Sequence, residues 1–113
     1  MTALFVILLS LRMLGIPCQI VTVSVSSYWD GSGAPPYQGL TASGVQTGPQ
    51  TCACGPRYPF GTVFIVDGVV YVCQDRGSAI TDGHLDLWMT SEEAAIKWGR
   101  QTLAAIVVTE EER

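Results

Sequence analysis

Residues 73–88 read CQDRGSAITDGHLDLW, and this stretch contains the two aspartates on which the predicted fold and function depend. An apolar run leads to Asp75, a glycine-containing turn follows, and a second apolar run surrounds Asp86. Aspartate is disfavoured inside strands, so two aspartates in such places need a reason. We expect a strand, a turn and a second strand, with one carboxylate at each junction between strand and turn.

Side chains alternate along the second of these strands. Leu85 and Leu87 are expected on one face, and Asp86 and Trp88 on the other. An acid beside a flat aromatic ring suits a surface that binds sugars. The alternative is that Asp75 caps a turn and Asp86 is a solvated strand residue, and spacing alone does not separate the two interpretations.

Composition sets the broad class of the protein. A chain of 113 residues forms one domain, and a hydrophobic content of 48% excludes a disordered polypeptide. The formal net charge is −4, and the six Lys and Arg residues are scattered. Nucleic acid binding requires a clustered basic face, so we expect no nucleic-acid partner. The acidic residues within 109–113 are expected to form a solvated tail.

The N-terminal segment is apolar but short. Residues 2–11 carry no charge, and Arg12 interrupts the run well before the roughly 20 residues that a spanning helix needs. A basic start and an Ala-x-Ala cleavage pattern are both missing. Three interpretations remain, namely an atypical signal peptide, a membrane anchor that carries one arginine, and a mis-set start codon. We expect residues 1–18 to be an export signal or membrane anchor, and the protein to reach the cell envelope or the extracellular space.

Four cysteines in a short chain with an expected export segment favour disulfides over free thiols: Cys18, Cys52, Cys54 and Cys73. A zinc site is disfavoured because the Cys52-x-Cys54 spacing is unusual for zinc and His84 is the only histidine. A catalytic cysteine is disfavoured because only that histidine could act as its base. We expect no metal and no cofactor.

Short strands dominate the predicted secondary structure. Alternation predicts a half-buried strand over residues 19–26, and apolar runs predict others at 62–66, 69–73, 85–89 and 103–108. Residues 52–59 are expected to form a short strand followed by a proline-bounded turn. The dipeptide Asp67-Gly68 predicts a two-residue hairpin. The run that follows it is almost wholly apolar, so we expect it to be buried on both faces.

One long loop and one helix complete the pattern. Glycine and proline make residues 29–50 a loop region, and residues 90–93 read TSEE, a capping box that opens a helix to about Gln101. No strand–helix–strand alternation occurs. The fold class is therefore mainly β, a small closed barrel with one packed C-terminal helix.

Five motifs occur in one order and at family-like spacing: TASG at 41–44, ACGPRYPFGT at 53–62, DRGSAI at 75–80, HLDLW at 84–88, and the helix at 91–100. Together they resemble the 3D domain, named for its three aspartates. This family occurs in bacterial cell-wall proteins, including stationary-phase survival proteins and the catalytic part of membrane-bound lytic transglycosylase A. The resemblance covers roughly residues 20–108, and we expect residues 19–108 to form one domain of this kind.

The resemblance implies a double-psi β-barrel that cleaves peptidoglycan glycan strands between N-acetylmuramic acid and N-acetylglucosamine. Asp86 matches the family's catalytic acid/base, and Asp75 matches the aspartate that supports it. The family's first aspartate is Gly55 here, and the second glycine of the turn is Ser78. Relatives with cysteines also imply a Cys54–Cys73 disulfide.

The predicted substrate-binding residues come from the same motifs: Thr41, Ser43, Arg76, Gly77 and Trp88. Arg76 is expected to neutralise one acid or to contact the muramic carboxylate, and its alternative role is a surface salt bridge. His84 is expected on the face of Asp86, as a packing residue rather than a base.

A lytic transglycosylase needs only one carboxylate. The acid protonates the glycosidic oxygen, the C6 hydroxyl of the muramic sugar attacks, and the same carboxylate accepts the proton of that hydroxyl, which yields a 1,6-anhydro sugar. Burial and the charge of Asp75 are expected to raise the pKa of Asp86. The alternatives are a non-catalytic wall-binding module and an interaction or inhibitor protein.

Overall fold

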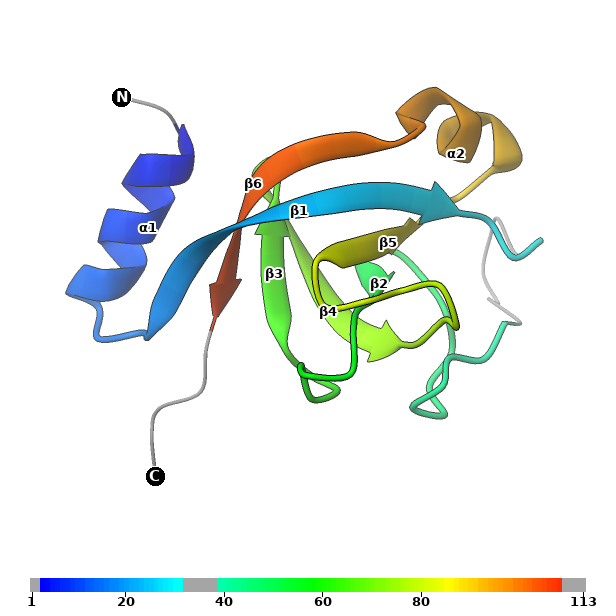
Figure 1. Cartoon of the computed structure of the whole chain (residues 1–113), viewed down its shortest axis with the longest axis horizontal. Helices are drawn as coiled ribbons and strands as arrows, with labels where there is room; N and C mark the ends of the chain where they lie inside the picture. The colour runs from blue at the N-terminus through cyan, green and yellow to red at the C-terminus, as the bar shows by residue number, and fades with distance from the viewer. Residues whose placement is uncertain (1–2, 32–38, 109–113) are drawn as a thin grey trace.

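The computed structural model describes residues 3–31 and 39–108, which form a barrel with a helix on each side (Figure 1). The elements in chain order are α1 (Ala3–Met13), β1 (Cys18–Tyr28), β2 (Thr51–Ala53), β3 (Val63–Val66), β4 (Val69–Asp75), β5 (His84–Trp88), α2 (Glu92–Trp98) and β6 (Gln101–Val108). The predicted strands are all present, with bounds shifted by a few residues.

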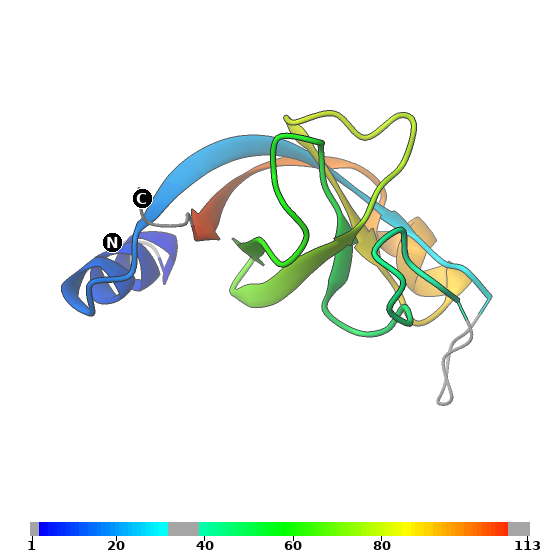
Figure 2. The ribbon, with the colours of Figure 1, turned by 90° about the horizontal axis from the view of Figure 1, so that it is seen from below.

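The strands close into a barrel in the order β1-β5-β2-β4-β3-β6. The pairs β1–β5 and β2–β4 are parallel, and the other pairs are antiparallel. The long, curved β1 pairs with β6 along most of its length and with β5 at its end (Figure 2). The predicted mainly-β barrel with a packed C-terminal helix is confirmed, and the two parallel pairs fit the double-psi arrangement.

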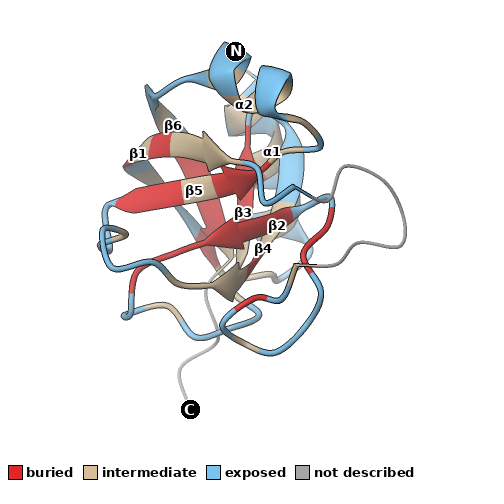
Figure 3. Cartoon of the chain, turned by 90° about the vertical axis from the view of Figure 1, so that its right-hand side faces the viewer, coloured by how far each residue is buried: buried red, intermediate tan, exposed pale blue. Residues whose placement is uncertain are grey.

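Apolar side chains from all six strands fill the barrel. Leu85 and Leu87 are completely buried, so the face predicted for them is the core face. Figure 3 shows burial along most of β2 and β5. The core cluster is made of Val23, Val25, Cys52, Cys54, Phe64, Val66, Cys73, Leu85, Leu87, Ala105 and Val107.

The hairpin between β3 and β4 forms as predicted. Asp67 and Gly68 both have positive φ, 52° and 77°, which suits a tight two-residue turn. The prediction that the following run is buried on both faces is wrong, because Val69 and Val70 are 44% and 40% exposed. On its other side, β4 pairs with β2 only from Val72 onward, so among the described residues the start of β4 pairs with β3 alone.

The helix α2 begins one residue later than the predicted capping box requires. Ser91 is the N-cap, and its hydroxyl accepts a hydrogen bond from the backbone N–H of Ala94, so the third helical position holds alanine and no glutamate box forms. The helix ends at Gly99, whose φ is 65°. It is therefore shorter than predicted, and β6 starts earlier.

Two hydrogen bonds fix α2 on the end of the barrel. Trp98 Nε1 donates to the carbonyl of Val25 at 3.2 Å, and Ser27 Oγ donates to the carbonyl of Ala95 at 2.7 Å. Both contacts involve the last residues of β1. The helix therefore stabilises the part of β1 that lies beside β5.

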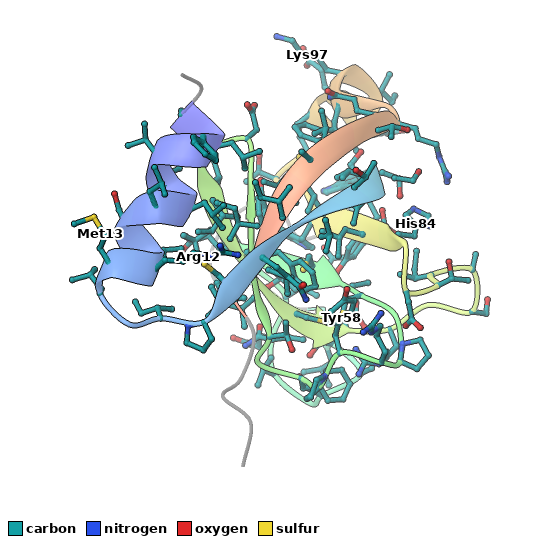
Figure 4. All side chains as sticks on the ribbon, turned by 60° about the vertical axis from the view of Figure 1, so that its left-hand side comes forward. Arg12, Met13, Tyr58, His84 and Lys97 are labelled. Carbon is teal, nitrogen blue, oxygen red and sulfur yellow. A yellow bond between two sulfur atoms is a disulfide. The ribbon has the colours of Figure 1, made fainter. Side chains whose placement is uncertain are left out.

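The apolar N-terminal segment forms α1, which lies against the other end of the barrel. Leu8 packs in a small cluster with Cys18, Ile65 and Ile106. Figure 4 shows Arg12 directed toward the barrel, where its Nη2 donates to the carbonyl of Cys18. No helix in the described residues is long and apolar enough to cross a membrane. The assignment of residues 1–18 to an export signal or anchor stays a prediction.

Candidate functional site

The two aspartates flank one residue of β2. Ala53 is the register partner of Asp75 on β4 and also of Asp86 on β5. Register partners on neighbouring strands direct their side chains to the same face of a sheet, which places Asp86 on the face of Ala53. The pairing with β4 shifts register between Cys52 and Ala53, so register alone does not place Asp75. The Tyr28 hydroxyl donates to Asp75, and the charges of both aspartates raise the pKa of Tyr28, so the two carboxylates share a face. Their backbones are two strand spacings apart, roughly 10 Å. In the sheet, Ala53 is the residue between them.

Asp86 lies in the middle of β5, since that strand starts at His84. The expectation that it marks a strand–turn junction is therefore wrong, whereas Asp75 does end β4 as expected. Parallel pairing with β1 makes Ser26 the register partner of Asp86. Ser26 Oγ donates to Asp86 Oδ1 at 2.8 Å.

The environment of Asp86 favours its neutral form. Its side chain is half-buried, and burial is the largest effect that raises the pKa of this carboxyl above its ordinary value. The hydrogen bond from Ser26 and the charges of His84 and Arg100 act in the opposite direction, and the negative charge of Asp75 raises the pKa further. The predicted rise is confirmed, and such a shift suits a general acid.

The carboxylate of Asp75 is held by three donors. Tyr28 Oη donates to Oδ2 at 3.0 Å, and the backbone N–H groups of Ala42 and Arg76 both donate to Oδ1 at 2.9 Å. Burial and then the two carboxylates, Asp75 before Asp86, raise the pKa of Tyr28 above its usual range. The phenol therefore stays protonated and remains a donor.

The predicted substrate-binding residues Thr41 and Ser43 belong to the turn that reaches Asp75. Thr41 Oγ1 donates to the carbonyl of Val45 at 2.9 Å and lies 3.0 Å from Ser43 Oγ. The backbone N–H of Ser43 donates to the carbonyl of Gln74 at 3.1 Å. These bonds hold the turn beside the end of β4 and present the N–H of Ala42 to the carboxylate.

Arg76 binds the segment between β2 and β3, which carries Cys54 of the disulfide. Its Nη2 donates to the carbonyl of Tyr58 at 2.6 Å, and its guanidinium lies 4.2 Å from the ring centre of Phe60. Its Nη1 lies 3.1 Å from Cys54 Sγ and 3.2 Å from Cys73 Sγ. Although Arg76 follows Asp75 in sequence, its guanidinium bonds backbone carbonyls and the disulfide sulfurs rather than either carboxylate.

The disulfide implied by the family resemblance is present between Cys54 and Cys73, whose Cα atoms are 5.8 Å apart. Cys18 and Cys52 are buried free thiols. Burial and the nearby Asp86 and Asp75 raise the pKa of Cys52 to about 12, so this thiol stays neutral at ordinary pH.

Gly77 and Trp88, the other two predicted substrate-binding residues, differ in their exposure to solvent. Gly77 is exposed and, with Arg76, lines a shallow cavity of about 480 Å³ on the turn after β4. Trp88 keeps only 3% of its surface exposed. A ring so buried offers no free face to a sugar, and the expected pairing of Asp86 with an exposed aromatic on β5 does not occur.

The position of the family's first aspartate is closed by another segment. A Cβ atom at Gly55 would clash with the carboxylate and the backbone N of Asp82. Asp82 Oδ1 accepts a hydrogen bond from the backbone N–H of Arg57 at 2.9 Å. A carboxylate is therefore present at this turn, although it comes from the loop before β5.

Sequence reasoning missed Ser26 and Asp82 as site groups, and it missed the hydrogen bond from the Tyr28 hydroxyl to Asp75. The polar positions that alternate with valine at the end of β1 were a signal for a polar outer face. They could not show that this face lies beside β5. His84 was expected on the face of Asp86, and its Nε2 lies 2.8 Å from the same Ser26 Oγ (Figure 4 labels His84).

One comparison with known proteins finds a match, and it covers part of this site. A family model described as 3D domain matches residues 50–109, just over half of the chain. The match runs from β2 to β6 and includes both aspartates of the site, whereas Ser26 and Tyr28 precede it. A search of the curated proteins finds no match.

Proposed function

The chain belongs to the 3D domain family, a family of peptidoglycan-related cell-wall domains, and on this premise we propose that it is a peptidoglycan lytic transglycosylase. The observation that carries the proposal is the placement of Asp75 and Asp86 on one face, on either side of Ala53. The disulfide fits an exported protein.

In the proposed reaction, Asp86 is the general acid and then the general base. It protonates the oxygen of the bond between N-acetylmuramic acid and N-acetylglucosamine. The C6 hydroxyl of the muramic sugar then attacks its own anomeric carbon, and ionised Asp86 accepts the hydroxyl proton. The carboxyl is neutral again at the end, and the product is a 1,6-anhydro sugar. Ordinary glycosidases need a second catalytic carboxylate, whereas this intramolecular attack does not.

Asp75 supports this cycle through its charge and its fixed position. Three donors keep it in place, and its negative charge raises the pKa of Asp86. The turn at residues 41–44 and the cavity beside Arg76 and Gly77 are the surfaces that we propose for the glycan strand.

A non-catalytic peptidoglycan-binding module is the second candidate. One observation favours it, namely that the site has glycine at residue 55 where the family has its first aspartate. The same barrel can serve binding as well as catalysis, since a fold does not fix a function.

Digestion of purified peptidoglycan with mass analysis of the soluble products separates the two candidates. We expect 1,6-anhydro-muropeptides from the wild-type protein and a loss of at least about 100-fold in their rate of release with Asp86→Asn. Asp67→Asn is the matched control, because Asp67 lies in an exposed hairpin turn whose positive φ asparagine accepts.

Undiminished anhydro products with Asp86→Asn exclude this residue as the acid. Tight binding of the wild-type protein to intact sacculi without soluble product supports the binding module instead.

A further inference from the structure

A chain of hydrogen bonds links His84 to Asp86 through one hydroxyl. His84 Nε2 and Asp86 Oδ1 each lie 2.8 Å from Ser26 Oγ. The register of the parallel strands explains this, because Ser24 and Ser26 of β1 face His84 and Asp86 of β5 in turn. His84 is 8% exposed, whereas Ser26 and Asp86 are half-buried, so the His84 end of this hydrogen-bond chain is the one shielded from water.

The number of protons available determines which atom donates in each hydrogen bond between His84, Ser26 and Asp86. An ionised carboxylate only accepts hydrogen bonds, so Ser26 gives its single proton to Asp86. Nε2 of His84 must then carry a proton and donate it to Ser26. If Nε2 lacks that proton, the chain can reverse, with neutral Asp86 donating from Oδ1 to Ser26 and Ser26 donating to Nε2.

The two directions place the proton of neutral Asp86 on different oxygens. When Ser26 donates to Oδ1, that oxygen is an acceptor, and the acidic proton belongs on Oδ2. When the chain is reversed, the proton lies on Oδ1 and points at Ser26, away from any substrate. Only the first arrangement presents a proton to a glycosidic oxygen.

We propose that His84 is a positioning residue for Asp86, whose Nε2–H orients the Ser26 hydroxyl so that Asp86 carries its catalytic proton on Oδ2. The inference rests on the proposed function for its consequence, but its geometry does not depend on the substrate. His84 itself touches neither the glycan nor the reacting atoms in this role.

The other ionisable groups near Asp86 do not depend on Ser26 for their position or charge. Arg100 lies after α2 with its Nη1 3.3 Å from Ser24 Oγ, and Asp75 ends β4. The hydroxyl of Tyr28 and the thiol of Cys52 are neutral at ordinary pH. A change in the titration of Asp86 that depends on Ser26 therefore reflects the hydrogen bonds that link His84 to Asp86.

The first measurement uses the unmodified protein. His84 is the only histidine of the sequence, so ¹⁵N NMR gives one imidazole to assign. We expect the neutral ring to be protonated at Nε2 and unprotonated at Nδ1. The opposite tautomer overturns the proposal.

The second measurement follows the Asp86 carboxyl carbon by ¹³C NMR against pH. Ser26→Ala removes a donor that stabilises the ionised form, so the midpoint should move to higher pH, and Ser26→Thr, which keeps the hydroxyl, should restore it. Thr22→Ala, an exposed change on the same strand, should leave it unmoved. An unmoved midpoint in Ser26→Ala overturns the proposal.

The third measurement uses glycan cleavage. His84→Gln keeps an N–H donor and should retain most of kcat, whereas His84→Leu should lower kcat about tenfold with little change in KM. Equal kcat values for the two variants contradict the positioning role. The NMR arms need no substrate, so a protein that shows the expected tautomer and titration but releases no muropeptide overturns only the transglycosylase function.

Discussion

At the scale of single residues, the burial of Asp86, the proposed general acid, has a cost in stability. Burial disfavours its charge, so its pKa in the folded state is higher than the roughly 3.9 of an unfolded aspartate. A carboxyl with a raised folded pKa stabilises the fold at pH values below the unfolded pKa, and this contribution disappears as the pH rises through the folded pKa.

Asp86→Asn should therefore raise the melting temperature more at pH 7 than at pH 4. Asparagine keeps an acceptor for Ser26 and never carries the buried charge. Thermal unfolding followed by circular dichroism at both pH values checks this, with Asp67→Asn as the exposed control. An equal change at both pH values contradicts the stated origin of the pKa shift.

Residue 55 must be glycine because the backbone of another loop fills the space that a side chain would need. A Cβ there would lie 2.5 Å from the Cα of Asp82 and would also clash with its side chain. Gly55→Ala should lower the free energy of unfolding by about 1–3 kcal/mol, the usual cost of overpacking. Asp82→Ala should not rescue it, because the clashing backbone atoms remain.

Urea unfolding of the single and double variants measures this effect. Gly83→Ala is the control, since nothing lies within 4 Å of a Cβ at that glycine. Full rescue by Asp82→Ala would show that the side chain alone closes the position.

At the scale of elements, the disulfide and Arg76 together hold the segment before β3 against the end of β4. The bridge joins residues 19 apart, and a loop of this length is stabilised by about 3 kcal/mol in the chain-entropy model. Reduction should lower the free energy of unfolding by about this amount. Guanidinium unfolding with and without a dithiol measures the loss.

The double variant Cys54→Ala with Cys73→Ala serves as the control for reduction. Its stability should not respond to the dithiol, because Cys18 and Cys52 are already free thiols. A response of this variant would trace the effect to something other than the bridge.

Much of the element pattern could be predicted, because it depends on local sequence. Alternation predicted β1, and Asp67-Gly68 predicted the hairpin that the positive φ angles confirm. The burial of Trp88 and the exposure of Val69 could not be predicted, since each depends on what packs across from it. The same holds for Ser26, whose partner on β5 is 60 residues away.

At the scale of the whole molecule, α1 is an addition to a barrel that has its own core. The main core cluster contains no residue of α1, and the helix contributes only to a small cluster around Ile65 and Ile106. A protein that starts at Ile16 should therefore keep cooperative unfolding and the disulfide, with a lower melting temperature because Ile106 loses its cover.

Circular dichroism melts and a thiol count of the shortened protein check this prediction. The full chain is the reference for both. A broad, non-cooperative melt would show that the barrel depends on the helix, and that residues 1–18 are part of the folded domain.

The parallel pairing of β1 with β5 also determines when the site can exist. The contact between Ser26 and Asp86 joins chain segments 60 residues apart, and β5 is the strand that links β1 to β2 in the closed barrel. Such distant pairings form late, because the entropy of closing a long loop must first be overcome. Before closure, Asp86 is an ordinary solvated carboxyl with an ordinary acidity. The raised pKa of Asp86, on which the proposed acid role depends, is therefore acquired only when β5 pairs with β1.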